Sequence, residues 1–472
     1  MSEDPGALVP ELCLLGGAVV GLLAGLFLPR RRQWLVAVVC VVALLTGLAA
    51  TAVAATRPGR MVFGEGYAVD TGLNAVRIIV LVATLLVVCL SVETVRGHTR
   101  ETEFYVLVLL AALGAVMLAG TSDLLVLVAA YLLASVPGYA LAGFVKDAAG
   151  TEASMKYYLM GALLGITMLA GVTILFGVSG GTTFRTLHDA VGQAPHGAVA
   201  VGVVALLAGL AFKVGAVPAH FWVPDVTEGA SAPAAAFLTT VPKVGAIMAT
   251  YRLFDQALPD ASVRWPLLLA VLAAASMTLG NLAAFFQTSP RRLLAYSTIS
   301  QAGYVLMAVT AAGRSELAAR TLLFYLAGYA VTNLGAFAVV TELPAAGRLD
   351  DYGGLFRRQP WLALALVVCL LGLVGTPPTA VFVGKVGVFT AATDAGLTWL
   401  MVVAAINTVA SVFYYLRWIV PMFAAAPGRT EALAPAGRWA RGCAYVAAAG
   451  AILLGLASGP VLAQLTHPLL GG

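Results

Sequence analysis

Three lysines inside apolar segments are the residues of this chain best suited to acid–base chemistry. Lys213, Lys243 and Lys385 stand within long apolar runs, whereas most of the 27 basic residues lie in the polar stretches between such runs. Arginine stays protonated in proteins, but a buried lysine can lose and regain a proton. We therefore favour a proton relay. The alternative is a set of fixed cations that binds an anion or a lipid headgroup.

The composition places these apolar runs in a membrane. Of the 472 residues, 61% are hydrophobic and 10% are charged, against about 45–50% and about 25% in soluble domains. So few charges cannot cover a water-facing surface, which excludes a soluble enzyme, a nucleic-acid-binding protein and a disordered scaffold. A charged side chain at the bilayer centre costs about 2.5–3.5 kcal/mol on insertion scales. The three lysines are therefore expected to face protein or water.

About fourteen of the apolar runs are long enough to span a membrane as helices, which takes about 20 residues each. We expect an all-α, polytopic membrane protein with a single membrane domain over residues 1–472. Its expected parts are an N-terminal three-helix part (1–103), a first repeat (104–255), a second repeat (264–423) and a C-terminal helix (439–462).

Prolines interrupt the seventh and the twelfth predicted spans. Pro218 lies in Gly202–Val223, and Pro377 and Pro378 lie in the middle of Trp361–Ala392. Proline removes a backbone donor, so inside a membrane it marks a break whose freed groups need other partners. The two broken helices are five spans apart and run in opposite directions, which is typical of inverted repeats around a midplane ion site. We expect two inverted five-helix repeats, spans four to eight and nine to thirteen, although either break alone could be an ordinary kink.

Basic residues mark one side of the predicted bundle. Loops after odd-numbered spans hold fifteen Lys and Arg residues, and loops after even-numbered spans hold at most seven. Short cytoplasmic loops are enriched in Lys and Arg, so the odd loops are predicted to be cytoplasmic and both termini to lie outside. Arg77 and Arg417, near the ends of their spans, are expected to reach the interface by snorkelling.

Other polar residues are weaker candidates for a proton path. His220 either joins a water chain or is a hydrogen-bonded structural residue. Asp225 and Glu228 either collect protons or cap the following helix. Ser300 and Gln301, in the tenth span, either line a wet path or bond to a neighbouring helix. The five cysteines have neither metal-ligand spacing nor a pairing pattern, so we expect no metal site.

Several motifs resemble those of the antiporter-like membrane subunits of respiratory complex I, the bacterial NADH–quinone oxidoreductase. They are Phe212–Gly229, Ala236–Lys243, Arg292–Ser300, Asp351–Arg357, Gly375–Pro378, Phe382–Lys385 and Tyr414–Arg417. The Val-Pro-Lys sequence that ends at Lys243 is similar to subunit N rather than to subunits L and M. The resemblance covers essentially the whole chain.

The resemblance implies a function in proton translocation. Lys213 would be the central lysine, Lys243 the relay lysine and Lys385 the terminal lysine beside the second break. NADH oxidation and quinone reduction in other subunits would drive protons outward across the bacterial cytoplasmic (inner) membrane. NADH, FMN, iron–sulfur clusters and quinone would lie in partner subunits, leaving no cofactor and no catalytic redox centre in this chain. The expected partners are antiporter-like neighbours and small membrane subunits of the complex.

The sequence departs from that family at two positions. Leu132, three residues before Ser135, stands where the fifth helix typically carries the gate glutamate that pairs with the central lysine. Asp123 is nine residues earlier, about 13 Å along a helix, and cannot replace it. Gln301 stands where the tenth helix often has histidine. We therefore expect an altered or lost switch at Lys213. The alternatives are a subunit of a multisubunit cation/proton antiporter or membrane-bound hydrogenase, and a structural paralogue with an impaired proton channel.

Overall fold

The computed structural model describes residues 4–258, 264–424, 435–466 and 468–470. Within them the chain consists of helices and loops, with one short antiparallel hairpin in which β1 (Arg60–Val62) pairs with β2 (Tyr67–Val69). The expectation of an almost entirely helical membrane fold is confirmed. The hairpin, in the loop after the second helix, was not expected.

The helices follow the order of the predicted spans. The first part holds α1 (Val9–Phe27), α2 (Leu35–Ala55) and α3 (Thr71–Val95). The next holds α4 (Glu101–Gly120), α5 (Leu124–Ala142), α6 (Ala148–Ser179), α7 (Phe184–Val191), α8 (His196–Val214), α9 (Trp222–Gly229) and α10 (Ala232–Gln256). The last holds α11 (Trp265–Ala284), α12 (Pro290–Val309), α13 (Leu317–Glu342), α14 (Leu355–Arg358), α15 (Pro360–Val374), α16 (Ala380–Asp394), α17 (Thr398–Phe423), α18 (Trp439–Leu456) and α19 (Ser458–Gln464).

Twelve helices of the described residues are long and apolar enough to cross a membrane, and α15 is a shorter apolar helix. Helix α12 falls on the predicted tenth span but is less apolar than these twelve helices. The count of about fourteen spans and the inverted symmetry of the two repeats stay predictions.

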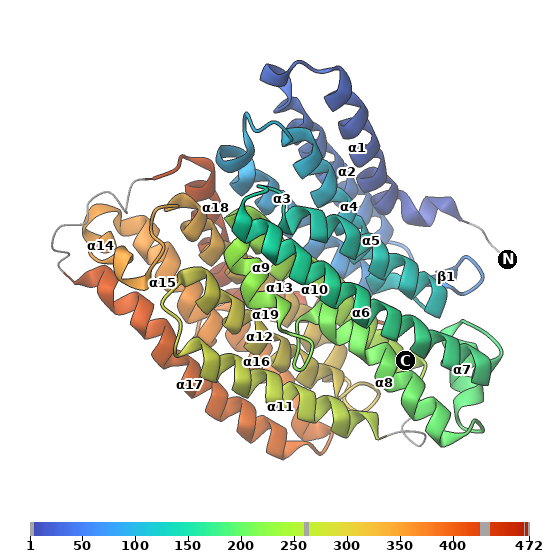
Figure 1. Cartoon of the computed structure of the whole chain (residues 1–472). Helices are drawn as coiled ribbons and strands as arrows, with labels where there is room; N and C mark the ends of the chain where they lie inside the picture. Colours follow the sequence, from blue (N-terminus) through green and yellow to red (C-terminus); the bar gives the residue numbers. More distant parts are fainter. Residues whose placement is uncertain (1–3, 259–263, 425–434, 467, 471–472) are drawn as a thin grey trace.

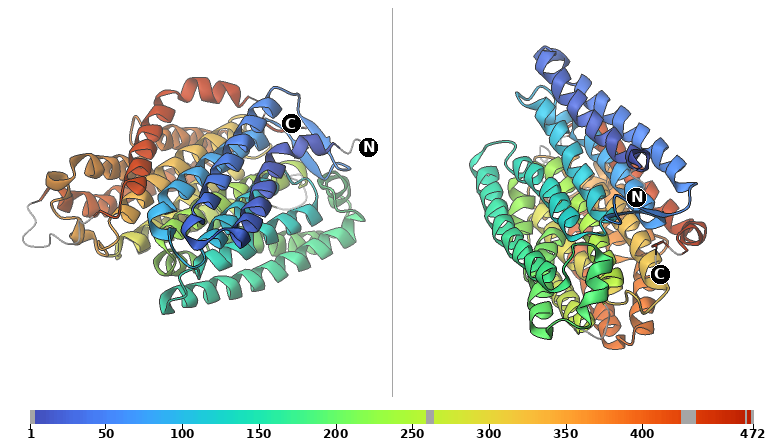
Figure 2. Two further views of the ribbon diagram at one scale, coloured as in Figure 1. Left: turned by 90° about the horizontal axis from the view of Figure 1, so that it is seen from above. Right: turned by 90° about the vertical axis from the view of Figure 1, so that its right-hand side faces the viewer.

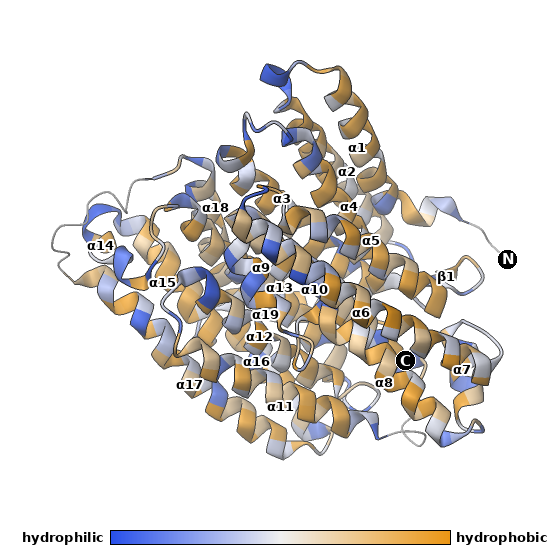
Figure 3. Ribbon diagram, in the orientation of Figure 1, coloured by the Kyte–Doolittle hydropathy of each residue, from blue (hydrophilic) through white to orange (hydrophobic). Residues whose placement is uncertain are grey.

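The bundle is more polar at its centre than at its surface, as expected where lipid surrounds the protein. The 18-residue spanning stretch of α10 has a mean hydropathy of 1.3 and is fully buried, whereas that of Arg30–Ala55, which contains α2, has 2.6 and is one-third buried. Figure 1 shows α1 and α2 at one edge and α11 and α17 at the opposite edge. Hydrophobic residues follow these outer helices in Figure 3. Inside, α10 packs against α4, α8, α12 and α13, so the centre is made of helices from both predicted repeats.

Both predicted helix breaks are confirmed. Helix α8 ends before Gly215 and α15 ends before Gly375, and both glycines have left-handed backbones, with φ of 72° and 86°. In each case the next residue donates its N–H back to a carbonyl in the last turn of the helix, at 2.9 Å for Ala216 and 3.1 Å for Thr376. This is a common helix-ending motif that glycine favours. The Val217–Pro218 and Pro377–Pro378 peptide bonds are cis.

The two ends of the described chain lie on the same side of the bundle (Figures 1 and 2). Asp4 forms an ion pair with Arg60 of the hairpin at 2.7 Å. The Pro468 carbonyl accepts the Gly72 N–H at the start of α3 at 2.6 Å. The chain therefore crosses the bundle an even number of times between these points.

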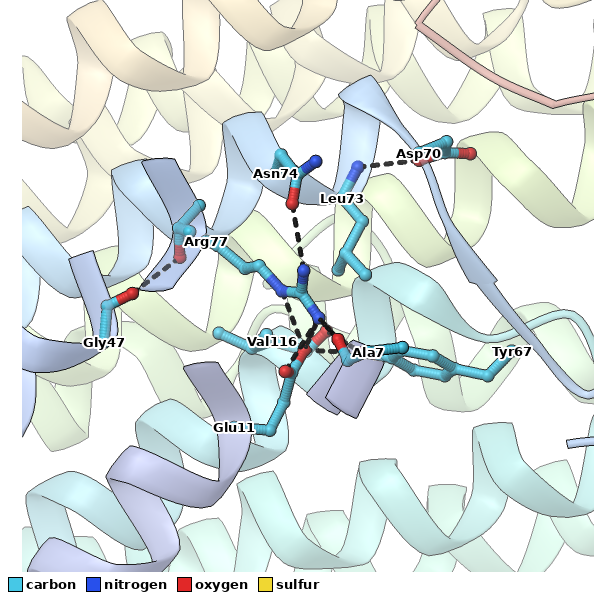
Figure 4. Close-up of polar contacts among 10 residues, drawn as sticks. Ala7, Glu11, Gly47, Tyr67, Asp70, Leu73, Asn74, Arg77 and Val116 are labelled. Atoms are coloured by element: carbon cyan, nitrogen blue, oxygen red, sulfur yellow. Dashed lines mark hydrogen bonds and ion pairs between the residues drawn. The ribbon is translucent and has the colours of Figure 1, made fainter. Parts of the chain in front are cut away.

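A buried ion pair joins α1 to α3. Arg77 is completely buried and donates to Glu11 at 2.6 Å, with Asn74 and the Ala7 carbonyl as further acceptors (Figure 4). Tyr67 of the hairpin donates to the same carboxylate at 3.1 Å. The snorkelling prediction for Arg77 is therefore wrong, because a buried carboxylate from α1 neutralises the guanidinium within the protein.

A second buried pair joins α3 to the central helix. Arg252, in the last turns of α10, makes a two-pronged contact with Asp70 at 2.8 and 3.0 Å and also donates to the Ala119 carbonyl. Oδ1 of Asp70 also accepts the Leu73 N–H and caps α3. Helix α10, which carries Lys243, is thereby fixed along its axis against α3 and α4.

Candidate functional site

The three candidate lysines are all buried, with 2%, 2% and 3% of Lys213, Lys243 and Lys385 exposed. Lys213 stands in the last turn of α8 before the first break, and Lys243 in the middle of α10. Lys385 lies in α16, the helix that follows the second break. The seventh, eighth and twelfth predicted spans therefore place their lysines inside the protein, as expected for functional charges in a membrane.

Lys213 is held by a hydroxyl group. Its Nζ donates to Ser135 Oγ of α5 at 2.8 Å and lies 5.5 Å from the centre of the Tyr131 ring. Leu132, at which the resemblance leads us to expect a carboxylate, is 48% exposed at the surface of the chain. Asp123 is occupied as the cap of α5, where it accepts two backbone N–H groups. Lys213 thus has a hydroxyl group, Ser135 Oγ, as its hydrogen-bond partner in place of a carboxylate.

Lys243 is held by a backbone carbonyl of the neighbouring helix α12. Its Nζ donates to the Thr298 carbonyl at 3.0 Å and lies 5.8 Å from the centre of the Tyr329 ring. Tyr329 shares a hydrogen bond of 2.7 Å with the Thr298 hydroxyl. A methyl group at Gly215 would lie 3.9 Å from the lysine nitrogen, so Lys243 lies next to the first break.

Lys385 is held by the second break itself. Its Nζ donates to the carbonyl of Val374, the last residue of α15, at 2.9 Å, and to Thr408 Oγ1 at 3.3 Å. The centre of the Tyr304 ring lies 3.9 Å away. The last carbonyls of a helix lack partners within the helix and carry a partial negative charge. The break therefore provides an acceptor for the lysine.

None of the three lysines forms an ion pair with a carboxylate in the part of the chain that the structure describes. Each ammonium group is instead held by one or two neutral acceptors and the face of a tyrosine ring. A neutral acceptor attracts a cation less strongly than a carboxylate does, so it opposes loss of the proton less. This arrangement suits residues that exchange protons better than a fixed ion pair would.

Helix α12 connects the surroundings of Lys243 and Lys385. Thr298 contacts Lys243, and Tyr304, six residues further on, contacts Lys385. Between them, Gln301 donates to the Leu373 carbonyl at 2.8 Å and accepts from the Tyr325 hydroxyl. The Ser300 hydroxyl is buried and has no protein partner. Gln301 therefore bonds to neighbouring helices, the second of its two predicted roles, while its place on a proton path stays a prediction.

His220 and Asp225 lie in and after the first break. His220 is 5% exposed and its Nδ1 has no protein partner. Asp225 in α9 accepts from Lys156 at 2.9 Å and lies 3.5 Å from Arg292 of α12. Charged groups from α6, α9 and α12 thus meet around Asp225 and border a cavity of about 180 Å³.

Glu228 lies at the end of α9 beside the start of two other helices. Its carboxylate accepts from Ser289 Oγ, the cap of α12, at 2.6 Å. Residue Ser231 begins α10, without a side-chain cap. The alternative in which Asp225 or Glu228 caps α10 is therefore wrong. Glu228 borders a second cavity, of about 350 Å³, between the starts of α10 and α12.

Sequence reasoning missed the tyrosines that face the lysines. Tyr131, Tyr304 and Tyr329 stand in largely apolar helices, where an aromatic residue is usually a packing residue. Their spacing holds a signal: Tyr304 follows Gln301 by three residues and therefore lies on the same side of α12. Among the described residues, no group of three or more His, Cys, Asp and Glu side chains could hold a metal ion.

Comparisons with known proteins show what the chain is similar to. A family model described as "NADH:quinone oxidoreductase/Mrp antiporter, TM" matches residues 121–411. NADH-quinone oxidoreductase subunit N 1 of Streptomyces griseus is 58% identical over 465 residues, 98% of each chain. A chain of respiratory complex I from Thermus thermophilus with bound aureothin has a TM-score of 0.82 and 33% identity, covering 96% of this chain and 98% of that one. A chain of the Mrp complex from Dietzia sp. shares the fold, with a TM-score of 0.84 at 23% identity over 97% and 95%.

Proposed function

Since the chain belongs to the antiporter-like membrane subunits of NADH–quinone oxidoreductase, and among them to subunit N, we propose that Lys213, Lys243 and Lys385 carry protons through it. The observation that supports this most is the setting of the lysines. All three are buried, and each is held by neutral acceptors. All three lie at a helix break, Lys213 and Lys243 beside Gly215 and Lys385 beside Gly375. A change at a break would therefore alter the partners of a lysine directly.

We propose that protons enter from the cytoplasmic side near Asp225, Glu228 and His220. The two cavities beside α9 support this entry, because each is bordered by a carboxylate. Both termini would then lie outside, as the distribution of basic loops predicts, and protons would leave on that side. Without a carboxylate at Leu132, Ser135 would hold Lys213 between transfers.

The chain would work with partner subunits of the complex. In this proposal, NADH, FMN, iron–sulfur clusters and quinone act in those partners, and redox energy reaches this chain as changes at its contacts with antiporter-like neighbours and small membrane subunits. The fold alone does not separate this function from cation/proton antiport, because the Mrp chain has the same fold. The 58% identity to a subunit N favours complex I.

The Lys243→Ala variant tests the proposed function. Inverted membrane vesicles from a strain that carries it are given NADH, and proton uptake is followed with a pH-sensitive dye. We expect NADH oxidation to continue and the number of protons moved per NADH to fall. The reason is that the variant loses the proton-carrying group that joins α10 to α12. Proton uptake per NADH that is unchanged in the variant would contradict the proposal. So would wild-type vesicles that take up Na⁺ instead of H⁺ during NADH oxidation.

A glycine substitution tests the contact between the second break and Lys385. A methyl group at Gly375 would lie 2.9 Å from Cδ of Lys385, so Gly375→Ala is expected to displace the lysine stem and reduce proton uptake several-fold. Alanine also strains a left-handed backbone by about 1–2 kcal/mol. Gly396, with φ of 77° and no atom within 4 Å of such a methyl group, supplies the matched control. Equal losses of uptake in Gly375→Ala and Gly396→Ala would show that backbone strain is the cause.

A further inference from the structure

The ring of Tyr304 lies nearer to a lysine nitrogen than the ring of either other tyrosine that faces a candidate lysine. The ring centre is 3.9 Å from Nζ of Lys385, against 5.5 Å for Tyr131 and Lys213 and 5.8 Å for Tyr329 and Lys243. Tyr304 is fully buried. A cation over an aromatic face is attracted most strongly where water is excluded. The contact at Lys385 is therefore the one in which a ring contributes most.

The hydroxyl group of Tyr304 fixes the direction of the ring. It donates to the Ala404 carbonyl of α17 at 3.2 Å and accepts from Thr408 Oγ1 at 3.0 Å. The ring also stacks on Phe389 of α16, with centres 6.3 Å apart. Because the hydroxyl is occupied by α17, the ring offers its face to Lys385.

The other groups around Lys385 are neutral. Its hydrogen-bond acceptors are the Val374 carbonyl and the Thr408 hydroxyl, and no carboxylate pairs with it in the described residues. Because the other two partners are neutral oxygens, the negative face of the Tyr304 ring contributes substantially to holding the protonated Lys385 side chain in place.

We propose that Tyr304 is the positioning residue of Lys385, and that the face of its ring, rather than its hydroxyl group, holds the protonated lysine for proton transfer. This inference rests on the proposed function. Helix α12 would then contact two of the lysines, Lys243 through the Thr298 carbonyl and Lys385 through the Tyr304 ring.

The test changes the electron density of the ring while keeping its shape. Complexes that carry Tyr304→Phe, or trifluorophenylalanine at the same position, are compared in inverted vesicles for protons moved per NADH. We expect Tyr304→Phe to keep most of the proton translocation, because the ring face remains. Fluorination withdraws electron density from the face, and we expect it to lower translocation about tenfold, as loss of a buried cation–π contact would. A purely structural role would give equal values for the two rings.

Tyr304→Leu removes the ring, and Tyr105→Leu, at a buried tyrosine of α4 away from the three lysines, controls for the cavity that such a change leaves. We expect only Tyr304→Leu to lose translocation at equal amounts of assembled complex. A loss in Tyr304→Phe as large as in Tyr304→Leu, or no difference between the phenylalanine and its fluorinated form, would overturn the proposal. The Lys385→Ala variant, measured in the same assay, distinguishes failure of the Tyr304 proposal from failure of the proposed function. Unchanged proton translocation in Lys385→Ala would refute the proposed function itself.

Discussion

Replacing Lys385 with alanine is expected to slow proton translocation by about 100-fold or more, because a positioned proton-transfer group typically contributes about 10²–10⁴-fold. The change removes the group that joins the Val374 carbonyl to Thr408, and no other lysine, histidine or carboxyl side chain is hydrogen-bonded to either atom in the described structure. NADH oxidation by the redox subunits is expected to persist. The measurement is the initial rate of proton uptake by inverted vesicles, divided by the rate of NADH oxidation.

Lys385→Gln separates proton transfer from hydrogen bonding. Glutamine can still donate to the Val374 carbonyl but cannot gain or lose a proton in this range, so we expect it to be as defective as alanine. Lys146→Gln, at an exposed lysine in the loop before α6, is the control for loss of a positive charge and should leave translocation unchanged. A glutamine variant that translocates normally would show that Lys385 is only a donor.

Arg77→Met is expected to prevent stable assembly of the chain. The substitution leaves Glu11 buried without its partner, and breaking a buried ion pair in this way costs about 3–5 kcal/mol. A typical domain has a net stability of only about 5–15 kcal/mol. Figure 4 shows that the guanidinium also holds Asn74 and the Ala7 carbonyl, and these groups lose a donor as well. The measurements are the amount of chain in isolated complex and its thermal midpoint.

Two further variants identify the cause of that loss. Arg185→Met breaks a surface pair with Glu65, in which the side chains are 74% and 50% exposed, and should have little effect. The double variant Arg77→Met with Glu11→Leu replaces both charges with apolar groups and should recover much of the stability. A double variant that is as unstable as Arg77→Met would contradict the assignment of the effect to the unpaired carboxylate.

The positions of the helices and their breaks could be predicted from the sequence because the membrane imposes simple requirements. Long apolar runs must be helical, and Pro218 and Pro378 remove backbone donors that must then be replaced. The candidate lysines could be predicted for the same reason, since a charge in such a run needs protein or water around it. Helix α12 was also predicted, although its polar residues lower its hydropathy.

The partners of these residues could not be predicted, because they come from distant parts of the chain. Arg77 is neutralised by Glu11, 66 residues away, and Arg252 by Asp70, 182 residues away. Tyr304 stands next to Lys385 only because α12 and α16 pack together. In the sequence, nothing marks Glu11 as the partner of Arg77, and Tyr304 looks like a packing residue.

The structure changes the interpretation of Leu132, the position at which the resemblance leads us to expect a carboxylate. The side chain is 48% exposed, while Ser135, one turn further along α5, bonds to Lys213. The departure therefore lies on the surface of this chain, and the buried partner of the lysine is a hydroxyl group. The switch at the central lysine would then depend on changes at the break beside it.

Arginine at the three lysine positions tests the proton relay most directly. Lys213→Arg, Lys243→Arg and Lys385→Arg keep the positive charge, but arginine stays protonated and cannot pass the proton on. Measured as protons moved per NADH in inverted vesicles, the relay predicts that each arginine variant falls to the level of the matching alanine variant. Arginine variants that translocate protons at the wild-type ratio would contradict it and would identify the lysines as fixed cations.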